Sequence, residues 1–444
     1  MITPKTLPGF MELLPAQQIV FEKIKAKIAQ VYERYGFTPL DTPVLELSDI
    51  LLAKAGGETE KQIYRFTKGD TDMCMRFDLT VPLARYVAQH QNDLAFPFKR
   101  YHIGKAYRGE RPQSGRFREF YQCDIDVIGS GQLSVVYDAE LPAIIYSLFK
   151  ELGLEDFCIH FNNRLLMKGF FESLGLEENS TDITRLIDKW DKIGADGVRE
   201  CLKEIISDDE KIDNILSFVQ ISGTSEEILG SLKGQQIENE NYQKGLEELS
   251  ILVDSLGDLK VPADYFCVDL KIMRGHDYYT GTVYETFVKG HREWGCICGG
   301  GRYDNLTGYY TNKVFPGVGM SIGLSRLFDV LNKQGCIPAT KQTIADILIL
   351  PMGIRSYALQ VASSLRDEGI STQVLLDDMK FKNKMVYANK VGVPFVLILG
   401  EEEEKSQTVT LKNMITGEQK TLKINEIKNE IKQENQQKLI VMKG

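Results

Sequence analysis

The segment Gly104–Gly129, GKAYRGERPQSGRFREFYQCDIDVIG, constrains the fold most, because an arginine-rich loop lies there between two runs that alternate like β-strands. Alternation with period two puts Gln122, Asp124 and Asp126 on one face of the second strand. The pattern therefore predicts a β-hairpin with carboxylates on its floor.

The tip of this predicted hairpin carries cations. Arg108 ends the first strand and Arg116 enters the second. Guanidinium groups match phosphate oxygens, and a fixed carboxylate accepts hydrogen bonds from an ammonium or imidazole N–H. Such a surface suits a ligand that is anionic at one end and cationic at the other, as ATP beside an amino acid would be.

Composition places the chain among soluble globular proteins of two to four domains. It has 444 residues, of which 43% are hydrophobic and 26% charged. The start, MITPKTLPGF, has no basic segment followed by an apolar run, and no stretch approaches the length of a membrane span. We therefore expect a cytoplasmic protein without a membrane partner.

The eight cysteines are scattered through a large chain, which predicts free thiols. Cys296 and Cys298 would share a strand face and could bind a metal. No second pair or nearby histidine completes such a site, so buried apolar thiols are the favoured interpretation and no metal ligand is expected.

The net charge of −9 excludes general attraction to nucleic acid, so any such binding must be local. Two places qualify. The segment 99–119 is rich in Lys and Arg, and a second cluster lies near the C-terminus at Lys380, Lys382, Lys384 and Lys390. A solvated helix face is the alternative interpretation of the lysine cluster.

The periodicity of the first part predicts a helix followed by a sheet. Apolar residues at helical spacing predict a helix over 15–36 that stops at Gly36. One antiparallel sheet is expected from the short apolar strands that follow: Asp72–Phe77, Phe96–Tyr107, Phe117–Ile128, Phe266–Met273, Thr282–Val288 and Val314–Ile322.

Two other patterns interrupt and follow this sheet. From about Arg164 to Lys260 the sequence is acidic, helical in period and poor in strand residues, which predicts a helical insertion. From about Ala339, fully apolar strands alternate with helices, which predicts a separate small sheet with parallel strands. The acidic run Glu401–Lys405 is expected to be a solvated loop.

Two glycine-rich stretches could let backbone approach a ligand closely. They are GCICGGGRYDNL at 295–306 and PGVGMSIGLSRLF at 316–328, which carries Arg326. Each is weak by itself, because glycines that allow strands to pack would look the same. Neither fits a dinucleotide fingerprint, and the chain contains no P-loop sequence.

Five motifs in order resemble the histidyl-tRNA synthetase family of class II aminoacyl-tRNA synthetases. YGFTPLDTPVLE is similar to motif 1 of the class, GERPQSGRFREF to motif 2 and GMSIGLSRLF to motif 3. RGHDYYTG and GGGRYD resemble two signatures peculiar to the histidine enzyme, and the resemblance spans the whole chain.

The resemblance implies an α+β catalytic domain with an antiparallel sheet flanked by helices, a helical insertion and a C-terminal α/β domain. The implied segments are 1–163 for the first part of the catalytic domain, 164–260 for the insertion, 261–335 for the second part of the catalytic domain, and 339–444 for an anticodon-binding domain. A homodimer is implied as well, with motif 1 at its interface.

The family's residue roles are carried over to matching positions. Arg274 and Arg108 would be the catalytic cations. The ATP-binding residues would be Arg108, Glu110, Arg116, Phe120 and Arg326, with Phe120 stacked on adenine. Histidine would be bound by Asp78, Thr80, Gln122, Asp126, Tyr278, Tyr279 and Tyr303. Mg²⁺ would neutralise the pyrophosphate leaving group.

The implied function is a ligase that activates L-histidine with ATP and transfers the histidyl group to tRNA(His). Two positions depart from the family pattern: Ser325 replaces an acidic residue of motif 3, and His276 replaces an apolar residue. The alternatives are an inactive paralogue that regulates histidine biosynthesis and a class II enzyme for another amino acid. The imidazole-facing positions Asp126 and Tyr279 argue against the latter.

Overall fold

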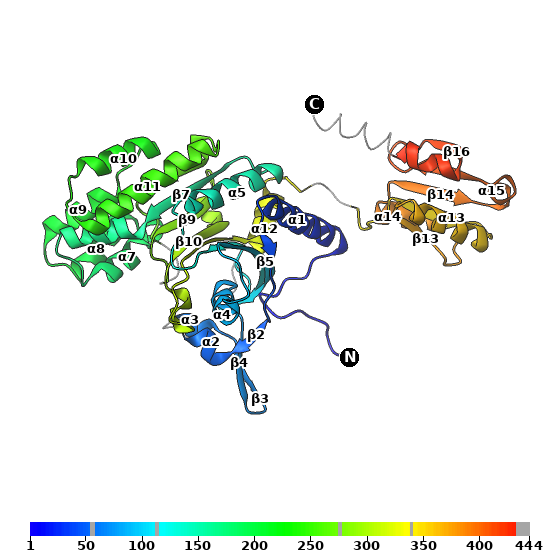
Figure 1. Cartoon of the computed structure of the whole chain (residues 1–444). Coiled ribbons are helices and arrows are strands. Elements are labelled where there is room, and N and C mark those ends of the chain that lie inside the picture. Colours follow the sequence, from blue (N-terminus) through cyan, green and yellow to red (C-terminus); the bar gives the residue numbers. More distant parts are fainter. Residues whose placement is uncertain (54–57, 112–114, 274–277, 338–340, 432–444) are drawn as a thin grey trace. The chain divides into compact units, whose positions relative to one another are not determined.

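The computed structural model describes residues 1–53, 58–111, 115–273, 278–337 and 341–431 (Figure 1). The chain divides into two compact units, residues 1–12 with 24–337 and residues 13–23 with 338–444. Each unit has a β-sheet of its own. No helix in the described ranges is long and apolar enough to cross a membrane.

The first unit is built on an eight-stranded sheet of order β1-β5-β6-β11-β10-β9-β7-β8. Neighbours from β5 to β7 pair antiparallel, whereas the outer pairs β1–β5 and β7–β8 are parallel. The prediction of an antiparallel sheet is thus confirmed for the central strands. Because the two outermost pairs are parallel, the sheet as a whole is mixed. Its strands are β1 (Thr38–Pro39), β5 (Phe98–Tyr107), β6 (Glu119–Ile128), β7 (Phe157–Asn163), β8 (Phe266–Val268), β9 (Thr282–Val288), β10 (Cys298–Tyr303) and β11 (Gly317–Gly323).

The hairpin predicted around the arginine-rich loop is formed by β5 and β6. Its ladder is continuous from the Phe98–Ile128 pair to the Tyr107–Glu119 pair. Arg108 directly follows β5, as predicted, but β6 begins at Glu119. Arg116 therefore lies in the connecting loop, because this loop is longer than the alternation of residues alone predicts.

The expectation that Asp72–Phe77 belongs to the main sheet is wrong. This segment contains β4 (Thr71–Met75), which pairs with β2 (Leu45–Leu47) and β3 (Arg65–Lys68) in a separate three-stranded sheet. Alternation identifies a strand but not its partner, and both edges of β4 are used by these two neighbours.

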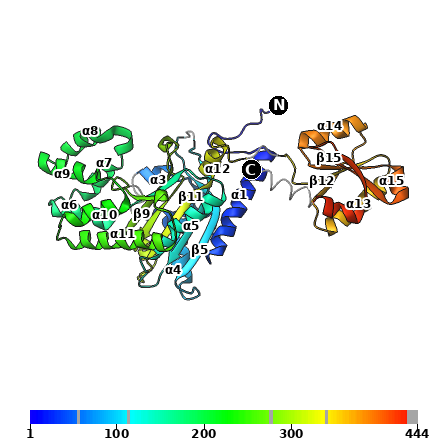
Figure 2. The ribbon, with the colours of Figure 1, turned by 90° about the horizontal axis from the view of Figure 1, so that it is seen from above.

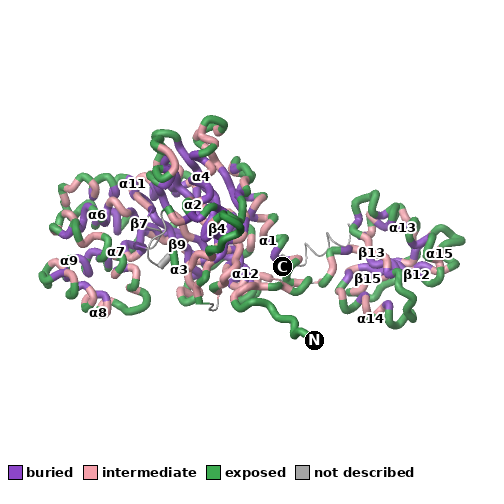
Figure 3. The backbone as a smooth tube through the Cα atoms, turned by 90° about the horizontal axis from the view of Figure 1, so that it is seen from below, coloured by how far each residue is buried: buried purple, intermediate pink, exposed green. Residues whose placement is uncertain are grey.

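Helices cover the main sheet, and buried residues run along its strands (Figure 3). The predicted N-terminal helix is α1, with Ile24, Ile28 and Val31 buried, and Gly36 follows it with a positive φ of 78°. Helix α1 spans Pro15–Arg34, and the other helices of this unit outside 164–260 are α2 (Ser48–Leu52), α3 (Glu58–Gln62), α4 (Thr80–His90), α5 (Tyr137–Glu151) and α12 (Leu324–Lys333).

The stretch 164–260 contains helices and no strand, and all of it is described. A Cβ on Gly245 would lie 2.2 Å from Leu166 N, so α6 and α11 touch along their backbones. These helices share the first unit with the main sheet. The division of the chain into four segments stays a prediction. The helices are α6 (Arg164–Ser173), α7 (Ser180–Ile187), α8 (Trp190–Lys203), α9 (Asp209–Val219), α10 (Ser225–Gly234) and α11 (Glu240–Asp258).

The C-terminal unit has a five-stranded sheet of order β13-β12-β14-β15-β16. The first three strands are parallel, as predicted, and β15 and β16 are antiparallel. Helix α13 covers one face of the sheet and α14 the other (Figure 2). The elements are β12 (Ile347–Pro351), α13 (Arg355–Asp367), β13 (Thr372–Val374), α14 (Phe381–Val391), β14 (Phe395–Leu399), α15 (Glu401–Ser406), β15 (Thr408–Asn413) and β16 (Gln419–Lys423).

The acidic run predicted to be a solvated loop is the short helix α15. Its N-cap is Gly400, whose backbone N–H donates to Glu403 Oε2 at 2.8 Å. The helix dipole favours glutamates in the first turn of a helix. The acidic residues that were predicted to form a loop therefore stabilise the start of α15.

Candidate active site

A cavity of about 400 Å³ gathers most of the predicted site residues in the first unit. This volume suits a small-molecule ligand. Arg274 lies outside the described residues. The cavity-lining residues among those predicted are Asp78, Thr80, Arg108, Glu110, Arg116, Phe120, Gln122, Tyr278, Tyr279 and Arg326. Asp126 and Tyr303 are not among the residues that line it, and both are buried.

Arg108 stands at the end of β5 between two aromatic rings. Its guanidinium carbon lies 4.4 Å from the Phe77 ring centroid and 5.0 Å from that of Phe120. Its Nε donates to the Phe77 carbonyl at 3.3 Å. Burial lowers the pKa of Arg108, and the nearby acids Asp78 and Glu110 act in the opposite direction. The fixed cation is thus ready to bind an anion.

Arg326 is held in the first turn of α12 by two backbone carbonyls. Its Nη1 donates to Cys296 O at 2.6 Å and its Nε to Gly115 O at 3.2 Å. Burial lowers the pKa of Arg326. The neighbouring Ser325 accepts a hydrogen bond from Tyr121 N at 3.1 Å, which ties α12 to β6. Neutral partners therefore orient Arg326 and leave its charge available.

Glu110 and Arg116 form an ion pair at the rim, with Oε2 and Nη1 3.6 Å apart. The Arg116 side chain is 43% exposed, so the pair is accessible to water. An exposed pair of this kind is worth about 0–1 kcal/mol. Either side chain can therefore exchange its partner for a ligand at little cost.

Further polar groups of the cavity lining come from β6 and from the segment just before α4. Asp78 Oδ1 accepts from Val81 N at 3.0 Å, so the helix start holds this carboxylate in place. Gln122 Nε2 donates to Ser321 Oγ at 2.7 Å. Gln122 Oε1 is buried and has no hydrogen-bond partner in the described residues. A buried acceptor without a donor is costly, and a ligand N–H would satisfy it.

Asp126 is enclosed behind the cavity. Its Oδ2 lies 2.7 Å from Arg100 Nη2, and its Oδ1 accepts from the Tyr303 hydroxyl at 2.6 Å. Burial raises the pKa of Asp126, while Arg100 and Tyr303 act to lower it. A Cβ on Gly319 would lie 2.0 Å from Asp126 Oδ1. The carboxylate is therefore held from three sides.

The three predicted tyrosines connect this buried acid to the cavity. The Tyr303 ring meets Tyr278 edge to face with centroids 6.0 Å apart, and Tyr278 meets Tyr279 in the same way at 4.9 Å. Such edge contacts fix ring positions. Burial raises the pKa of all three hydroxyls, so they stay neutral and can donate as well as accept hydrogen bonds.

Two charged residues of this site were not predicted. Arg100 pairs with Asp126 in the β5–β6 register, and only the exact hairpin register could have identified it. Glu285 lies in β9, where all residues are buried, and it lines the cavity. An acidic residue inside an apolar strand is a signal that could have been used.

The lysine cluster of the C-terminal unit does not form one exposed surface. Lys380, Lys382 and Lys390 are exposed. Lys384 is buried at 5% exposure, and its Nζ donates to Pro351 O at 2.6 Å. The prediction that Lys384 belongs to a nucleic-acid surface is wrong, because its side chain satisfies a strand-end carbonyl instead.

Comparisons with known proteins agree with this geometry. The family model described as histidyl-tRNA synthetase matches residues 9–327, and that of an anticodon binding domain matches residues 346–434. A histidine–tRNA ligase of Clostridium tetani is 53% identical over 96% of this chain and 97% of its own length. One of Finegoldia magna is 46% identical over 97% of this chain and 100% of its own.

A solved structure is similar over almost the full length. The crystal structure of histidyl-tRNA synthetase from Nostoc sp. PCC 7120 has a TM-score of 0.89 and 38% identity, and covers 98% of this chain and 100% of its own. The matches include both the unit with the main sheet and the C-terminal unit. The chain belongs to the histidyl-tRNA synthetase family.

Proposed function

We propose that the chain is a histidine–tRNA ligase that condenses L-histidine with ATP to histidyl-adenylate and pyrophosphate, and then transfers the histidyl group to the 3′ end of tRNA(His). Full-length relatives are curated as histidine–tRNA ligases, which supports this function. The observation that carries it is one cavity lined by the cations Arg108 and Arg326 together with the polar groups of Asp78 and Gln122.

An inactive regulatory paralogue is the second candidate, and the comparisons favour the ligase. The family match covers the main sheet, and the anticodon-binding match covers the C-terminal unit. Cations whose pKa values are shifted by their surroundings in a cavity are typical of functional sites. Arg108 and Arg326 are half-buried cations of this kind, and desolvation lowers the pKa values of both.

The residues that line the cavity suggest the ligand poses. Arg108 and Arg326 would hold the ATP phosphates, with Glu110 and Arg116 at the rim and Phe120 against adenine. If Arg108 moved away from the Phe120 ring, the face of that ring would be free to stack on the adenine of ATP. The α-ammonium of histidine would bind to Asp78, Thr80 and Gln122, whose Oε1 has a free lone pair.

The imidazole ring would reach the tyrosine-lined side. Tyr278 and Tyr279 would contact the ring. The hydrogen-bonded pair of Tyr303 and Asp126 would supply the polar groups on that side of the pocket. Arg274 would stabilise the charge that develops as the carboxylate attacks the α-phosphate. These assignments follow the matched positions of the family motifs.

The acidic residues of the cavity fit Mg²⁺. Magnesium prefers oxygen ligands and is commonly held by one or two carboxylates together with substrate phosphates. Glu110 and Glu285 both line the cavity and supply such carboxylates. The ion would neutralise phosphate charge when bound there.

A homodimer with motif 1 at its interface is also part of this proposal. Val44, Leu45 and Leu47 are 36%, 44% and 56% exposed, and Phe66 on β3 of the same three-stranded sheet is 42% exposed. A row of exposed apolar side chains on a small sheet favours association with another surface. The cytoplasm, where tRNA is charged, is the proposed location.

The test is ATP–pyrophosphate exchange measured with each of the twenty amino acids, followed by aminoacylation of tRNA(His). Exchange should depend on histidine, and label from histidine should appear on the tRNA. Absence of exchange with all twenty amino acids would favour the regulatory paralogue. Exchange with a different amino acid would favour another class II specificity.

A further inference from the structure

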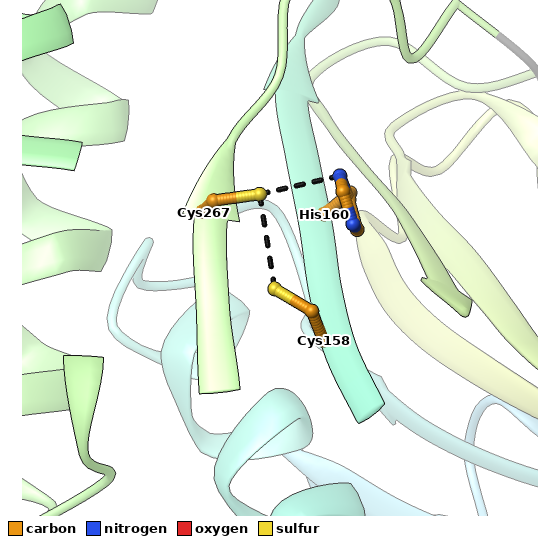
Figure 4. Close-up of side chains that lie close together, drawn as sticks. All are labelled: Cys158, His160 and Cys267. Carbon is orange, nitrogen blue, oxygen red and sulfur yellow. Dashed lines mark hydrogen bonds between the residues drawn. The ribbon is translucent and has the colours of Figure 1, made fainter. Parts of the chain in front are cut away.

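Two cysteines and a histidine meet at the outer edge of the main sheet, and none of them is among the residues that line the cavity (Figure 4). Cys158 and His160 are two residues apart on β7, so their side chains share one face of the sheet. Cys267 lies on β8 directly opposite His160 in the parallel register. Figure 4 shows the three side chains pointing toward one another.

The distances among these three groups match a tetrahedral metal site. The two sulfurs lie 3.8 Å apart, and Cys267 Sγ lies 3.2 Å from His160 Nδ1. With Zn–S bonds of about 2.3 Å and Zn–N bonds of about 2.05 Å, a regular tetrahedron has S–S and S–N edges of about 3.8 and 3.6 Å. All three donor atoms lie within 4.8 Å of one another.

The nearest oxygen belongs to Asp269, one residue after β8. Its Oδ2 lies 3.0 Å from His160 Nδ1. This distance is close to the N–O edge of about 3.3 Å that a tetrahedral site requires. Lys271 Nζ lies 3.3 Å from the other carboxylate oxygen, Oδ1, and Arg292 Nη2 lies 3.7 Å from Oδ2, so a bound ion would share Oδ2 with this arginine.

Solvent can reach the cluster at His160, whose side chain is 18% exposed. All three ligand residues are partly exposed, so an ion could reach them from solvent.

We propose that Cys158, His160 and Cys267 form a binding site for a divalent cation of the zinc type, with the Asp269 carboxylate as the nearest donor for the fourth position. Thiolate and imidazole ligands together select zinc over magnesium or calcium. None of these residues lines the cavity, but His160 lies opposite the cavity residue Glu285 in the β7–β9 register, so zinc binding is tested by metal content and not by ligase activity.

A bound ion would tie β7 to β8, which are joined by a short ladder of three residue pairs. After β8 the chain continues toward 274–281, the segment RGHDYYTG that resembles the first of the two signatures of the histidine enzyme. Asn162 on β7 donates to Leu270 O and Ile272 O at 3.1 and 3.2 Å, so the same strand also holds the segment that leads there. The ion would therefore have a structural role beside the signature.

The experiment uses the full-length protein, reduced with a phosphine, stripped with a chelator and dialysed against Zn²⁺. Metal content by mass spectrometry should be one zinc per chain. Co²⁺ in place of Zn²⁺ should give thiolate charge-transfer absorption and the intense d–d bands of a tetrahedral site. The double variant C158S/C267S should lose both signals and bind zinc at least tenfold more weakly.

The matched control is C201S/C336S, which removes two thiols that are also partly exposed but lie outside the cluster. It should bind zinc as the unmodified chain does. H160Q should retain charge transfer but shift the d–d bands, because one nitrogen ligand is removed.

A second measurement needs no variant. Zinc should protect Cys158 and Cys267 from alkylation and leave Cys336 reactive, as mapped by peptide mass spectrometry. The proposal is overturned if the reduced protein retains no zinc, or if C158S/C267S binds it equally well. It is also overturned if the two thiols are found only as a disulfide whose reduction restores no metal binding.

Discussion

Arg100 and Asp126 lie directly opposite each other across the β5–β6 hairpin, with Nη2 and Oδ2 2.7 Å apart and exposures of 0% and 2%. A buried guanidinium is tolerated only beside an anion, so Asp126 has a structural partner as well as its proposed role toward histidine. The two roles can be separated by experiment.

Asp126→Asn should lower stability and weaken histidine binding. Arg100 would lose its counter-charge, and truncating one partner of a buried pair costs about 3–5 kcal/mol. The KM for histidine should rise more than the KM for ATP, because the nucleotide end of the cavity is untouched. Urea unfolding and pyrophosphate exchange measure the two effects.

Tyr303→Phe is the control for this variant. It removes the hydroxyl that donates to Asp126 and leaves the ion pair intact. Its loss of stability should be smaller, about 1–3 kcal/mol. If Asp126→Asn left the histidine KM unchanged in folded protein, Asp126 would be a purely structural residue.

Asp124 should make stability depend on pH. Burial raises its pKa to about 7, with Asp126 adding to the effect and Arg100 opposing it. The pKa of an aspartate in the unfolded chain is about 3.9. Between this pKa and that of folded Asp124, the folded state therefore binds the proton more tightly than the unfolded state does. Stability should therefore fall as pH rises from about 4 to about 7, by at most about 1.4 kcal/mol per unit.

Asp124→Asn should remove this contribution, and the difference between variant and unmodified chain in urea unfolding at several pH values measures it. Asp182→Asn alters an exposed carboxylate and serves as the control. Equal pH slopes for Asp124→Asn and the unmodified chain would show that Asp124 ionises in the folded protein as it does in the unfolded chain.

Arg326→Ala should lower kcat/KM for ATP about 10²-fold or more, because a half-buried cation oriented by two carbonyls would be removed from the proposed phosphate site. Arg116→Ala, at the exposed rim, should cost less than about tenfold. Pyrophosphate exchange under varied ATP gives both values. Similar losses for the two variants would mean that orientation by Cys296 O and Gly115 O does not matter.

Leu45→Glu together with Leu47→Glu should convert a dimer into monomers. Both side chains are exposed and apolar, and charges there would be buried without partners in the proposed interface. Light scattering at micromolar concentration measures the mass. Leu259→Glu changes a side chain of 44% exposure elsewhere and should leave the mass unaltered. A monomeric unmodified chain with full activity would contradict the proposed dimer.

Charge reversal at Lys380 and Lys382 should weaken tRNA binding and flatten its salt dependence, by about one unit of slope for each phosphate that is no longer neutralised. Lys384→Met should instead reduce stability, since Pro351 O would lose its donor. Filter binding at several salt concentrations and thermal unfolding distinguish the two classes. Unchanged tRNA affinity would make the exposed lysines a solvated surface.

Local patterns predicted the hairpin, the helical stretch and the parallel C-terminal strands, because each rests on periodicity within a short segment. The sheet that β4 joins could not be predicted, because pairing depends on segments far apart in sequence. The same holds for Lys384, whose exposure depends on the end of β12 lying beside α14.

In the proposed sites, too, some residues could be predicted from local sequence patterns and others could not. Arg108 and Gln122 follow from the alternation around the loop and from the family motifs. The two sulfurs of Cys158 and Cys267 meet across 109 positions of sequence, and no spacing in the chain indicates it. The pair that spacing does indicate, Cys296 and Cys298, makes a different interaction, in which Cys296 Sγ donates to the Cys298 carbonyl at 3.0 Å.

The close approach of Gly319 to Asp126 has a consequence for how the protein can change over time. Any side chain at 319 would place a Cβ 2.0 Å from Asp126 Oδ1, and one at Gly300 would lie equally close to Gly319 O. If Asp126 faces the imidazole ring as proposed, a new amino-acid specificity would need a different group at 126, yet Arg100, Tyr303 and Gly319 all contact the present one. We therefore expect single substitutions at these positions to abolish function, so that a new specificity would require coordinated changes on β5, β6, β10 and β11.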